Sequence, residues 1–254
     1  MWELYDALIE EIPDEIIVDD VVVGGEMTYV EANGCIGLTA YRDYVQRAPM
    51  MTGNRIGRPL KEVAGYVKSW NFREASIGQS AINAWYNHPD TARRAGIEIA
   101  EKKRVEERLK DPFIKSQNLV KGKKVCVVGH FPFLEKLIAP VCDLSIVEWD
   151  PEEGDYPYSA CEYLLPECDY AFLTCAAIGD KSMPRLLELS ENAKGVTIVG
   201  PGTPLSSVFF EYGVSDLSGF VVTDVRLAKR ILAGAESQRI FGAGMKVEYL
   251  RGGV

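Results

Sequence analysis

The sequence contains few histidines, no closely spaced cysteine pair and no long apolar run. His88 and His130 are the only histidines among 254 residues, so one chain cannot build a histidine-rich metal site. The six cysteines include no Cys-x-x-Cys pair, and this spacing argues against a structural zinc site. No apolar run approaches the roughly 20 residues that a membrane-spanning helix requires. The sequence therefore predicts neither a zinc module nor a transmembrane segment.

Basic residues are also in deficit. The 28 Lys and Arg residues face 37 Asp and Glu residues, which gives a formal net charge of −9. This balance argues against non-specific nucleic-acid binding, which depends on Lys and Arg. Residues 1–6 are acidic and amphipathic, unlike the basic start of a signal peptide. We expect a cytoplasmic protein with neither a nucleic-acid partner nor a membrane partner.

The remaining composition is that of a globular protein. Hydrophobic residues make up 47% of the chain and charged residues 26%, so a substantial core can form. A length of 254 residues accommodates one large domain or two domains of ordinary size. Cys126 and Cys175 lie in apolar, strand-like runs and are expected to be reduced, buried thiols.

Residues 1–90 read as a small α+β domain. Asn33-Gly34 is a strong signal for a tight turn between two strands. The hydrophobic pattern predicts, in order, a helix over 2–11, strands over 16–18, 21–23, 27–31 and 35–39, and helices over 59–70 and 74–87. The last helix carries a face of small residues that suits close packing.

A charged connector and an α/β domain follow. Residues 91–119 include the charge run 101–108, which is typical of a solvated helix. Residues 120–254 alternate strands and helices, so we expect a Rossmann-like, doubly wound parallel sheet. The strands are predicted over 124–128, 144–148, 170–174, 196–199 and 219–223, and the helices over 134–139, 159–165, 183–192, 204–212 and 224–232.

The carboxyl ends of these strands are the expected ligand-binding edge. The candidate ligand-binding residues there are Gly129, Phe131, Thr174, Gly200, Gly202, Thr203 and Ser206. In segment 200–207, Thr203 is predicted to cap a helix that begins at Pro204. The free N–H groups of such a helix start attract an anion, although an ordinary strand-to-helix turn explains the same residues.

His130, Glu148 and Asp150 are the candidates for proton or cation chemistry. His130 suits acid–base work, but a half-buried histidine that caps the next helix is an equal alternative. Glu148 and Asp150 are the candidate metal ligands, although a solvated acidic loop accounts for them as well. Glu148 also lies near the spacing at which a carboxylate meets a ribose, yet the turn after Gly129 lacks Gly-x-Gly-x-x-Gly.

Four short motifs together resemble one known family. They are Gly129-His130-Phe131-Pro132, Glu148-Trp149-Asp150-Pro151, Asp169-Tyr170 with Thr174, and the segment from Gly200 to Ser206. These motifs resemble the "putative heavy-metal chelation" domain family, whose members carry a first domain similar to the enolase N-terminal domain. Residues 76–84 look like the helical motif of that domain. The resemblance implies an enolase-N-terminal-like domain packed on a Rossmann-like domain, with a cleft between them.

Ser80 and Asn83, on the small-residue helix, are expected to reach this cleft, unless neighbouring backbone satisfies them. The leading hypothesis is binding of a small anionic ligand or metal complex in the cleft, with a role in heavy-metal chelation or metal-cofactor handling. A divalent metal ion is the cofactor considered. The alternatives are an enzyme that uses a nucleotide-type cofactor and a structural subunit. Whether turnover occurs stays open, and a homo-oligomer is compatible with the sequence.

Overall fold

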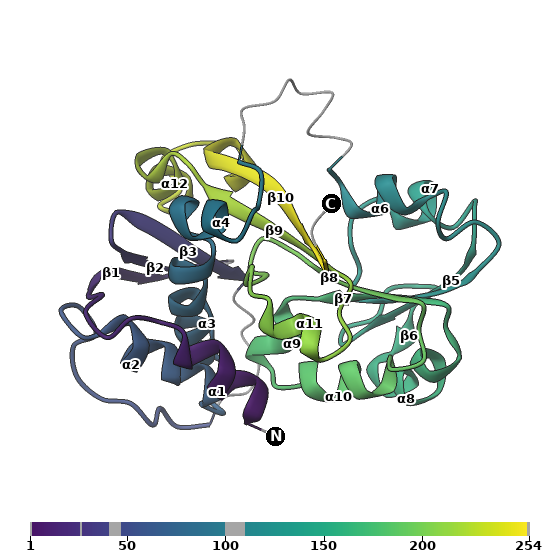
Figure 1. The fold of residues 1–254 in the computed structure, drawn as a ribbon, viewed down its shortest axis with the longest axis horizontal. Coiled ribbons are helices and arrows are strands. Elements are labelled where there is room, and N and C mark those ends of the chain that lie inside the picture. Colours follow the sequence, from purple (N-terminus) through teal and green to yellow (C-terminus); the bar gives the residue numbers. More distant parts are fainter. Residues whose placement is uncertain (1, 26, 41–46, 100–109, 253–254) are drawn as a thin grey trace.

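The computed structural model describes residues 2–25, 27–40, 47–99 and 110–252. It is a mixed α/β structure with a three-stranded antiparallel sheet and a seven-stranded, mostly parallel sheet (Figure 1). We call residues up to 99 the first half and residues from 110 the second half. Along these described ranges, no helix is both long and apolar enough to cross a bilayer.

The first half consists of the small sheet and the helices packed on it. The tight turn predicted at Asn33-Gly34 is confirmed, with positive φ angles of 52° and 73°. The sheet order is β1-β2-β3, and both pairings are antiparallel. The elements are α1 (Glu3–Glu10), β1 (Val18–Val23), β2 (Met27–Ala32), β3 (Cys35–Ala40), α2 (Leu60–Ala64), η1 (Gly65–Lys68), α3 (Phe72–Tyr86) and α4 (Pro89–Arg94).

The predicted close packing of the small-residue helix is confirmed at two glycines. A Cβ atom on Gly78 of α3 would lie 1.9 Å from the backbone nitrogen of Val67. A Cβ atom on Gly37 of β3 would lie 2.1 Å from the backbone nitrogen of Ala84. Because real Cβ atoms do not approach backbone so closely, only glycine permits α3 to lie against β3 and η1 at this distance.

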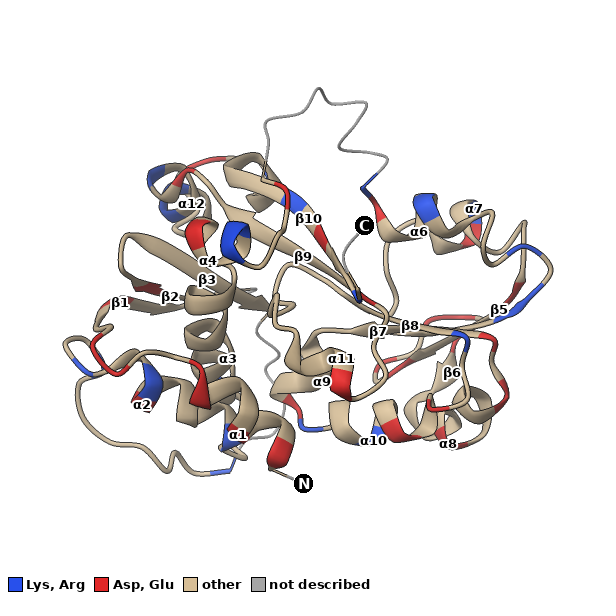
Figure 2. Ribbon diagram, viewed as in Figure 1, with Lys and Arg blue, Asp and Glu red and all other residues tan. Residues whose placement is uncertain are grey.

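The second half is built on the large sheet. Its order is β10-β9-β8-β7-β4-β5-β6, and β10 runs antiparallel to β9 while the other pairings are parallel. The strands are β4 (Lys124–Val128), β5 (Asp143–Glu148), β6 (Tyr156–Pro157), β7 (Tyr170–Thr174), β8 (Gly195–Val199), β9 (Asp216–Val222) and β10 (Gly244–Leu250). The central strands β7 and β8 carry no charged residue, whereas the helices and loops around them do (Figure 2).

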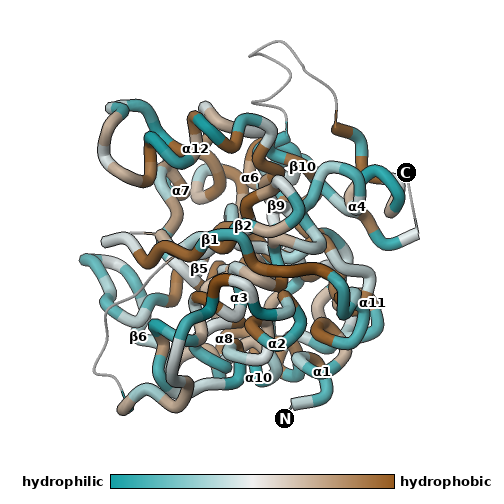
Figure 3. Tube along the Cα trace, turned by 90° about the vertical axis from the view of Figure 1, so that its left-hand side faces the viewer, coloured by the Kyte–Doolittle hydropathy of each residue, from teal (hydrophilic) through white to brown (hydrophobic). Residues whose placement is uncertain are grey.

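Helices cover both faces of this sheet. On β4, Val125 and Val127 belong to one core cluster, while Cys126 and Val128 belong to another. This alternation is expected of a strand buried on both faces. The helices are α6 (Pro112–Ser116), α7 (Leu134–Leu137), α8 (Cys161–Leu164), α9 (Ala176–Gly179), α10 (Met183–Leu189), α11 (Val208–Glu211) and α12 (Val225–Leu232), with short 3-10 turns η2 (Tyr158–Ala160), η3 (Leu165–Glu167) and η4 (Ile240–Ala243). Helices α1 and α12 carry both hydrophobic and hydrophilic residues along their length, as amphipathic helices do (Figure 3).

Three sequence-based expectations differ from the structure. The helix predicted over 204–212 is confined to α11, and the helix predicted over 159–165 is divided among η2, α8 and η3. The antiparallel strand β10 was not predicted. The charge run 101–108 lies outside the described residues.

The two halves share one continuous core and a buried polar seam. Tyr5 and Leu8 of the first half belong to the same core cluster as Ile178 and Phe209 of the second. The hydroxyl of Tyr5 also donates to the carbonyl of Ile178 at 3.0 Å. Joint burial of apolar surface therefore contributes to holding the halves together.

The polar seam consists of three amide side chains in the C-terminal half of α3 and at its C-cap: Gln79, Asn83 and Asn87. Gln79 donates to the carbonyl oxygens of Cys175 and Gly202, each at 2.9 Å. Asn83 donates to the carbonyl of Gly202 at 2.9 Å and to that of Leu38 at 2.6 Å. These bonds satisfy carbonyl groups that would otherwise be buried without partners.

Asn87 is the most fully engaged of the three. Its Nδ2 donates to the carbonyls of Thr203 and Phe220 at 3.0 and 3.1 Å, and its Oδ1 accepts from the backbone nitrogen of Leu205 at 3.1 Å. The bond to Leu205 fixes residues just after Pro204 in a non-helical conformation. This contact explains why the expected helix begins only at Val208.

We expect the Asn87→Ala substitution to lower the free energy of unfolding by about 3 kcal/mol, because it strands three buried backbone groups. The melting temperature should fall by roughly 10 °C. Thermal and urea unfolding monitored by circular dichroism measure both quantities. The matched control is Asn192→Ala, at an exposed position, which should change stability little. An equal effect of the two substitutions would contradict the structural role of Asn87.

Candidate functional site

The switch point of the large sheet lies between β4 and β7, where the chain turns from building one side of the sheet to building the other. Gly129 follows β4 with a φ of 107°. A Cβ atom at this position would lie 3.0 Å from Cβ of Thr174, at the end of β7. The structure therefore brings together two of the predicted strand-end residues, and the contact requires glycine at position 129.

Gly200, at the end of β8, is subject to a similar constraint. Its φ is 133°, and a Cβ atom there would lie 2.5 Å from Sγ of Cys175. The peptide after β8 consequently passes directly over the end of β7. The thiol of Cys175 serves here as packing surface for the loop, in keeping with the buried, reduced state predicted for it.

The expected cleft is closed where α3 meets the loop after β8. The side chains expected to line it are buried: Ser80, Asn83, Thr203 and Ser206. Ser80 donates to the carbonyl of Thr28, and Ser206 accepts from the backbone nitrogen of Val208. A Cβ atom on Gly202 would lie 2.8 Å from Oγ1 of Thr39, so this part of the interface is tightly packed.

The expectation that Thr203 caps a helix beginning at Pro204 is wrong, and the role of Thr203 in ligand binding stays a prediction. Helix α11 begins five residues later, at Val208, and its N-cap residue is Ser207. Thr203 is 0% exposed, and its Oγ1 has no hydrogen-bond partner among the described residues. The seam with α3 buries residues 202–206 of this loop, whereas Gly200 and Pro201 stay partly exposed.

His130 lies between two carboxylates. Its Nδ1 is 2.8 Å from Oδ2 of Asp155, and its Nε2 is 3.0 Å from Oε1 of Glu135. The Asp155 side chain is only 3% exposed, so its charge is poorly screened by water. The hydrogen bond that Nδ1 of His130 donates to the Asp155 carboxylate raises the pKa of His130 above its usual value. Such an arrangement favours the imidazolium form.

Glu148 is held by the backbone. Its Oε2 accepts from the nitrogen of His130 at 2.9 Å, and its Oε1 accepts from the nitrogen of Trp149 at 2.7 Å. Trp149 stacks on Tyr158 with ring centroids 4.1 Å apart. Asp150 is exposed to solvent. The Glu148 carboxylate therefore ties the ends of β4 and β5 together, and its metal-binding role stays a prediction.

A heavy-metal ion would need several His, Cys, Asp or Glu side chains close together. Over the described ranges, no group of three or more His, Cys, Asp and Glu side chains is arranged to hold a metal ion. Burial raises the pKa of the thiols of Cys35 and Cys161 to about 12 and that of Cys142 and Cys168 to about 11. Metals bind the thiolate form, which burial disfavours here. The described side chains do not fit direct chelation.

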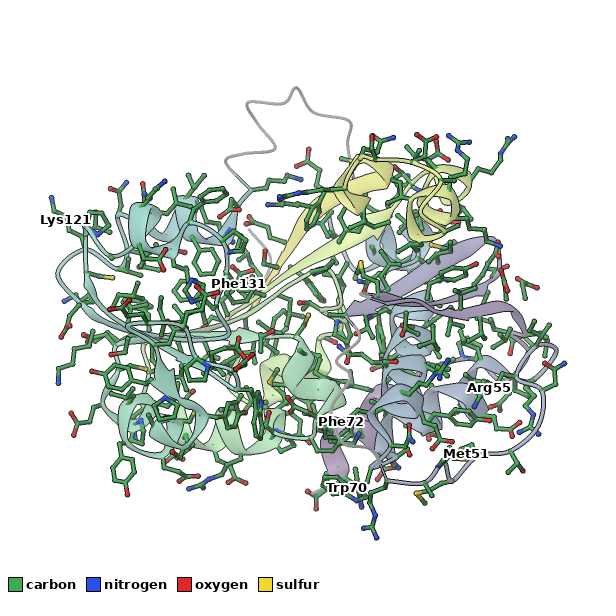
Figure 4. The ribbon with its side chains drawn as sticks, turned by 180° about the vertical axis from the view of Figure 1, so that it is seen from behind. Met51, Arg55, Trp70, Phe72, Lys121 and Phe131 are labelled. Carbon is green, nitrogen blue, oxygen red and sulfur yellow. The ribbon has the colours of Figure 1, made fainter. Side chains whose placement is uncertain are left out.

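An open cavity of about 250 Å³ lies beside the ends of β4 and β8. Phe131 and Gly200, both predicted ligand-binding residues, line it. Its apolar walls include Phe113, which packs on Phe131 with ring centroids 5.2 Å apart. Figure 4 shows Phe131 beside the strand ends. We call this cavity the strand-end pocket.

Phe133, on the wall of the strand-end pocket, has an unusual backbone conformation and an exposed side chain. It adopts a left-handed conformation with a φ of 72°, and 61% of its surface is exposed. A non-glycine residue in this conformation is strained, and such strain clusters at binding sites. A large aromatic side chain is thereby kept in contact with both solvent and the pocket.

Two cations and one carboxylate also line the strand-end pocket. They are Arg239, Lys246 and Asp111. Lys246, on β10, pairs with Asp111 at 3.0 Å and lies 5.3 Å from the ring centroid of Phe241, another wall residue. These three charged groups leave one formal positive charge in a chain whose net charge is −9. The pocket therefore combines aromatic walls with a local excess of positive charge.

Sequence reasoning missed most of this pocket. Phe113, Arg239 and Phe241 belong to no recognisable motif. Lys246 lies on β10, the strand that the hydrophobic pattern did not predict. The bulky Phe131-Pro132-Phe133 sequence after β4 was the available signal, because aromatic residues at that turn leave no room for a pyrophosphate but can form a binding wall.

Lys181 is a buried cation at the boundary of the halves. Its Nζ lies 5.8 and 5.2 Å from the ring centroids of Trp70 and Phe72, two aromatic residues of the first half that lie close together in Figure 4. Nζ donates to the carbonyl of Gly179 at 2.5 Å. Burial lowers the pKa of Lys181 to about 8, because the charged form loses hydration.

Two family models match the chain, and both are described as "Putative heavy-metal chelation". They cover residues 5–86 and 111–251. An uncharacterized protein of Methanocaldococcus jannaschii is 26% identical over 253 residues, covering 94% of this chain and 92% of its own length.

Two solved structures are similar over almost the whole chain. A protein with unknown function from the DUF364 family of Desulfitobacterium hafniense has a TM-score of 0.91 and 53% identity, and the match covers 99% of each chain. A DUF364-family protein with unknown function from Pyrococcus horikoshii has a TM-score of 0.77 and 18% identity, covering 98% of each chain. At that identity, the second likeness concerns the fold alone.

We expect the Asp155→Asn substitution to lower the pKa of His130, because the neutral amide no longer favours the imidazolium. Proton NMR titration resolves this directly, since His88 is the only other histidine and serves as an internal control. A raised pKa in the folded state stabilises the protein fully below pH 6.5, and this contribution is lost as the pH rises through the folded-state pKa. The stability difference between wild type and variant should therefore be largest in acid. An unchanged His130 titration would refute the pairing.

Lys181 should make the free energy of unfolding rise with pH in alkali, the opposite of the effect of His130. The unfolded chain keeps the lysine proton up to its usual pKa of 10.5, while the folded chain releases it near pH 8. As the pH rises between these values, the free energy of unfolding of wild type should increase relative to that of Lys181→Met, by on the order of 3 kcal/mol in total. Urea unfolding from pH 8 to 10.5 measures the difference. The control is Lys121→Met at an exposed position, and a Lys181→Met curve parallel to wild type would show that the lysine is solvated.

Proposed function

The chain belongs to the family described as "Putative heavy-metal chelation", whose longer match spans residues 111–251, and we propose that it binds a small anionic ligand or the metal complex of that ligand. The binding site in this proposal is the strand-end pocket. The observation that carries it is the combination, in about 250 Å³, of phenylalanine walls with Arg239 and Lys246. Ligand sites are commonly apolar cavities with a few convergent polar groups.

The proposed ligand is flat and negatively charged. The Phe113 and Phe131 rings form a wall against which a planar or aromatic group packs. Arg239 is exposed and presents a guanidinium group that recognises carboxylates in a bidentate manner. Lys246 adds a second cation, which Asp111 orients through their 3.0 Å ion pair. Binding one anion would thus use both the apolar and the cationic parts of the pocket.

In this proposal the metal arrives within the ligand. The described side chains offer no chelating group of three or more, so the metal's own ligands come from the small molecule. The cationic pocket then recognises the negative charge that remains on the complex. This interpretation reconciles the family description with buried, protonated cysteines.

His130 has a supporting role in the proposal. The ion pairs with Asp155 and Glu135 fix the residues immediately before Phe131. Glu148 reinforces the same turn through the backbone nitrogen of His130. These contacts hold the aromatic wall in place, so the proposal concerns binding and includes no catalytic step.

The finer architecture belongs to the same proposal. Residues 1–90 are assigned to the enolase N-terminal type and residues 120–254 to the Rossmann-like type, with residues 91–119 as the connector. The small antiparallel sheet and the mostly parallel sheet support this assignment. The acidic composition supports a cytoplasmic setting.

Pyridine-2,6-dicarboxylate is a suitable probe, because it is flat, dianionic and a metal chelator. Isothermal titration should compare the chelator alone, its zinc complex with two chelators per Zn²⁺, which keeps a net negative charge, and Zn²⁺ alone, and the first two should bind. Arg239→Gln and Lys246→Gln should each weaken binding roughly 10- to 100-fold, as expected for loss of a charged hydrogen bond. Saturating probe should also raise the stability of wild type, by about 2.7 kcal/mol at 100 times Kd.

The matched control is Arg226→Gln, which removes the same charge at an exposed position of α12 outside the pocket. It should bind the probe as wild type does. Tight binding of Zn²⁺ alone, with no binding of chelator or complex, would overturn the proposal in favour of direct chelation. An equal loss of probe affinity in Arg239→Gln, Lys246→Gln and Arg226→Gln would show that the overall charge of the protein, and not the pocket, determines binding.

A further inference from the structure

A second and larger cavity lies in the first half. It encloses about 430 Å³ between β1, the segment that precedes α2, and the first turns of α3. Its walls combine the apolar side chains of Val21, Val23 and Ile77 with Arg55 and Arg73. Cavities of about 300 to 1,000 Å³ are typical of small-molecule sites. We call this space the first-half cavity.

Arg55 is the key polar group of this cavity. Its guanidinium carbon lies 5.6 Å from the ring centroid of Tyr66, a fully buried side chain. One face of the guanidinium group is therefore packed against this ring. Nε of Arg55 is buried and has no hydrogen-bond partner among the described residues. A buried donor without a partner is costly, and such groups are frequently completed by a bound ion or ligand.

The one carboxylate of the cavity wall is already satisfied. Glu74 is 2% exposed and accepts from the backbone nitrogens of Met50 and Met51 at 3.0 and 2.8 Å. The hydroxyl of Ser69 donates to it at 2.6 Å. These three bonds fix the chain that forms one side of the cavity, so Glu74 shapes the cavity while the donors of Arg55 remain available.

The amide side chains of the wall are also engaged. Asn54 donates to the carbonyl of Ile56 and accepts from its nitrogen. Asn71 accepts from the nitrogen of Glu74 and donates to the carbonyl of Arg47. Among the described side chains that line the cavity, the arginines are therefore the ones that present donors to the space, with Arg55 partly buried and Arg73 exposed. A single half-buried guanidinium matches one carboxylate, which it binds through two parallel bonds.

We infer that the first-half cavity binds a monocarboxylate with an apolar tail. The carboxylate pairs with Arg55, and the tail packs against Val21, Val23 and Ile77. This site is separate from the strand-end pocket, because Arg55 and Phe131 lie on different sides of the molecule (Figure 4). It does not depend on the proposed function and assigns the first half a ligand of its own.

Titration of acetate, butyrate and hexanoate, followed by methyl NMR of the valine and isoleucine side chains, tests the inference. Affinity should rise about fourfold for each methylene that becomes buried. Hexanoate should shift signals of Val21, Val23 and Ile77. Arg55→Met should weaken hexanoate binding at least tenfold, and Arg55→Lys should retain part of the affinity, because the charge persists without the planar fork.

The matched control is Arg58→Gln, at an exposed arginine three residues along the chain that pairs with Glu62 outside the cavity. It should bind hexanoate as wild type does, as should Arg239→Gln in the other pocket. Circular dichroism confirms that each variant is folded before titration. Absence of hexanoate binding to wild type, equal binding to folded Arg55→Met, or equal affinity for inorganic phosphate and hexanoate would each overturn the inference.

Discussion

The hydrogen bonds that α3 makes to the loop after β8 are the interaction on which the rest of the structure depends. Gln79, Asn83 and Asn87 supply amide groups to backbone carbonyls that have no partner in the sheet. A loop at the end of a parallel strand normally keeps such groups in water. Here the first half replaces that water, so residues 202–206 of the loop can be buried between the two sheets.

This seam decides where a ligand can bind. Because it fills the space over the end of β8 on the α3 side, the cavity left at the strand ends lies on the opposite side, toward α6, α7 and β10. The aromatic residues after β4 and the cations near β10 then meet across it. The location of the proposed binding site therefore follows from which side of the loop the first half covers.

The sequence predicted the elements with strong local signals. The Asn33-Gly34 turn, the small-residue helix α3 and the strands β4, β5, β7, β8 and β9 follow from backbone preferences and hydrophobic period, which are local properties. The candidate site was predicted only in part. Gly129, Phe131, Thr174 and Gly200 do meet at the strand ends, because the carboxyl ends of parallel strands share an edge.

What could not be predicted depends on packing between distant segments. Nothing local to Asn83 or Thr203 indicates that their polar atoms lie in a buried interface rather than in an open cleft. Their environment is set by contacts across more than a hundred residues, such as the bond between Asn83 and Gly202. Likewise, Lys246 joins the pocket only because β10 pairs with β9 in the antiparallel direction.

The antiparallel strand β10 has a consequence for how the pocket is assembled during synthesis. Arg239, Phe241 and Lys246 all follow β9 in the chain, and β10 takes its position only by folding back along β9. A nascent chain that has emerged as far as β9 can therefore already hold the aromatic wall around Phe131, yet it lacks the groups that recognise charge. The cationic groups of the proposed binding site are thus synthesised after the aromatic wall around Phe131.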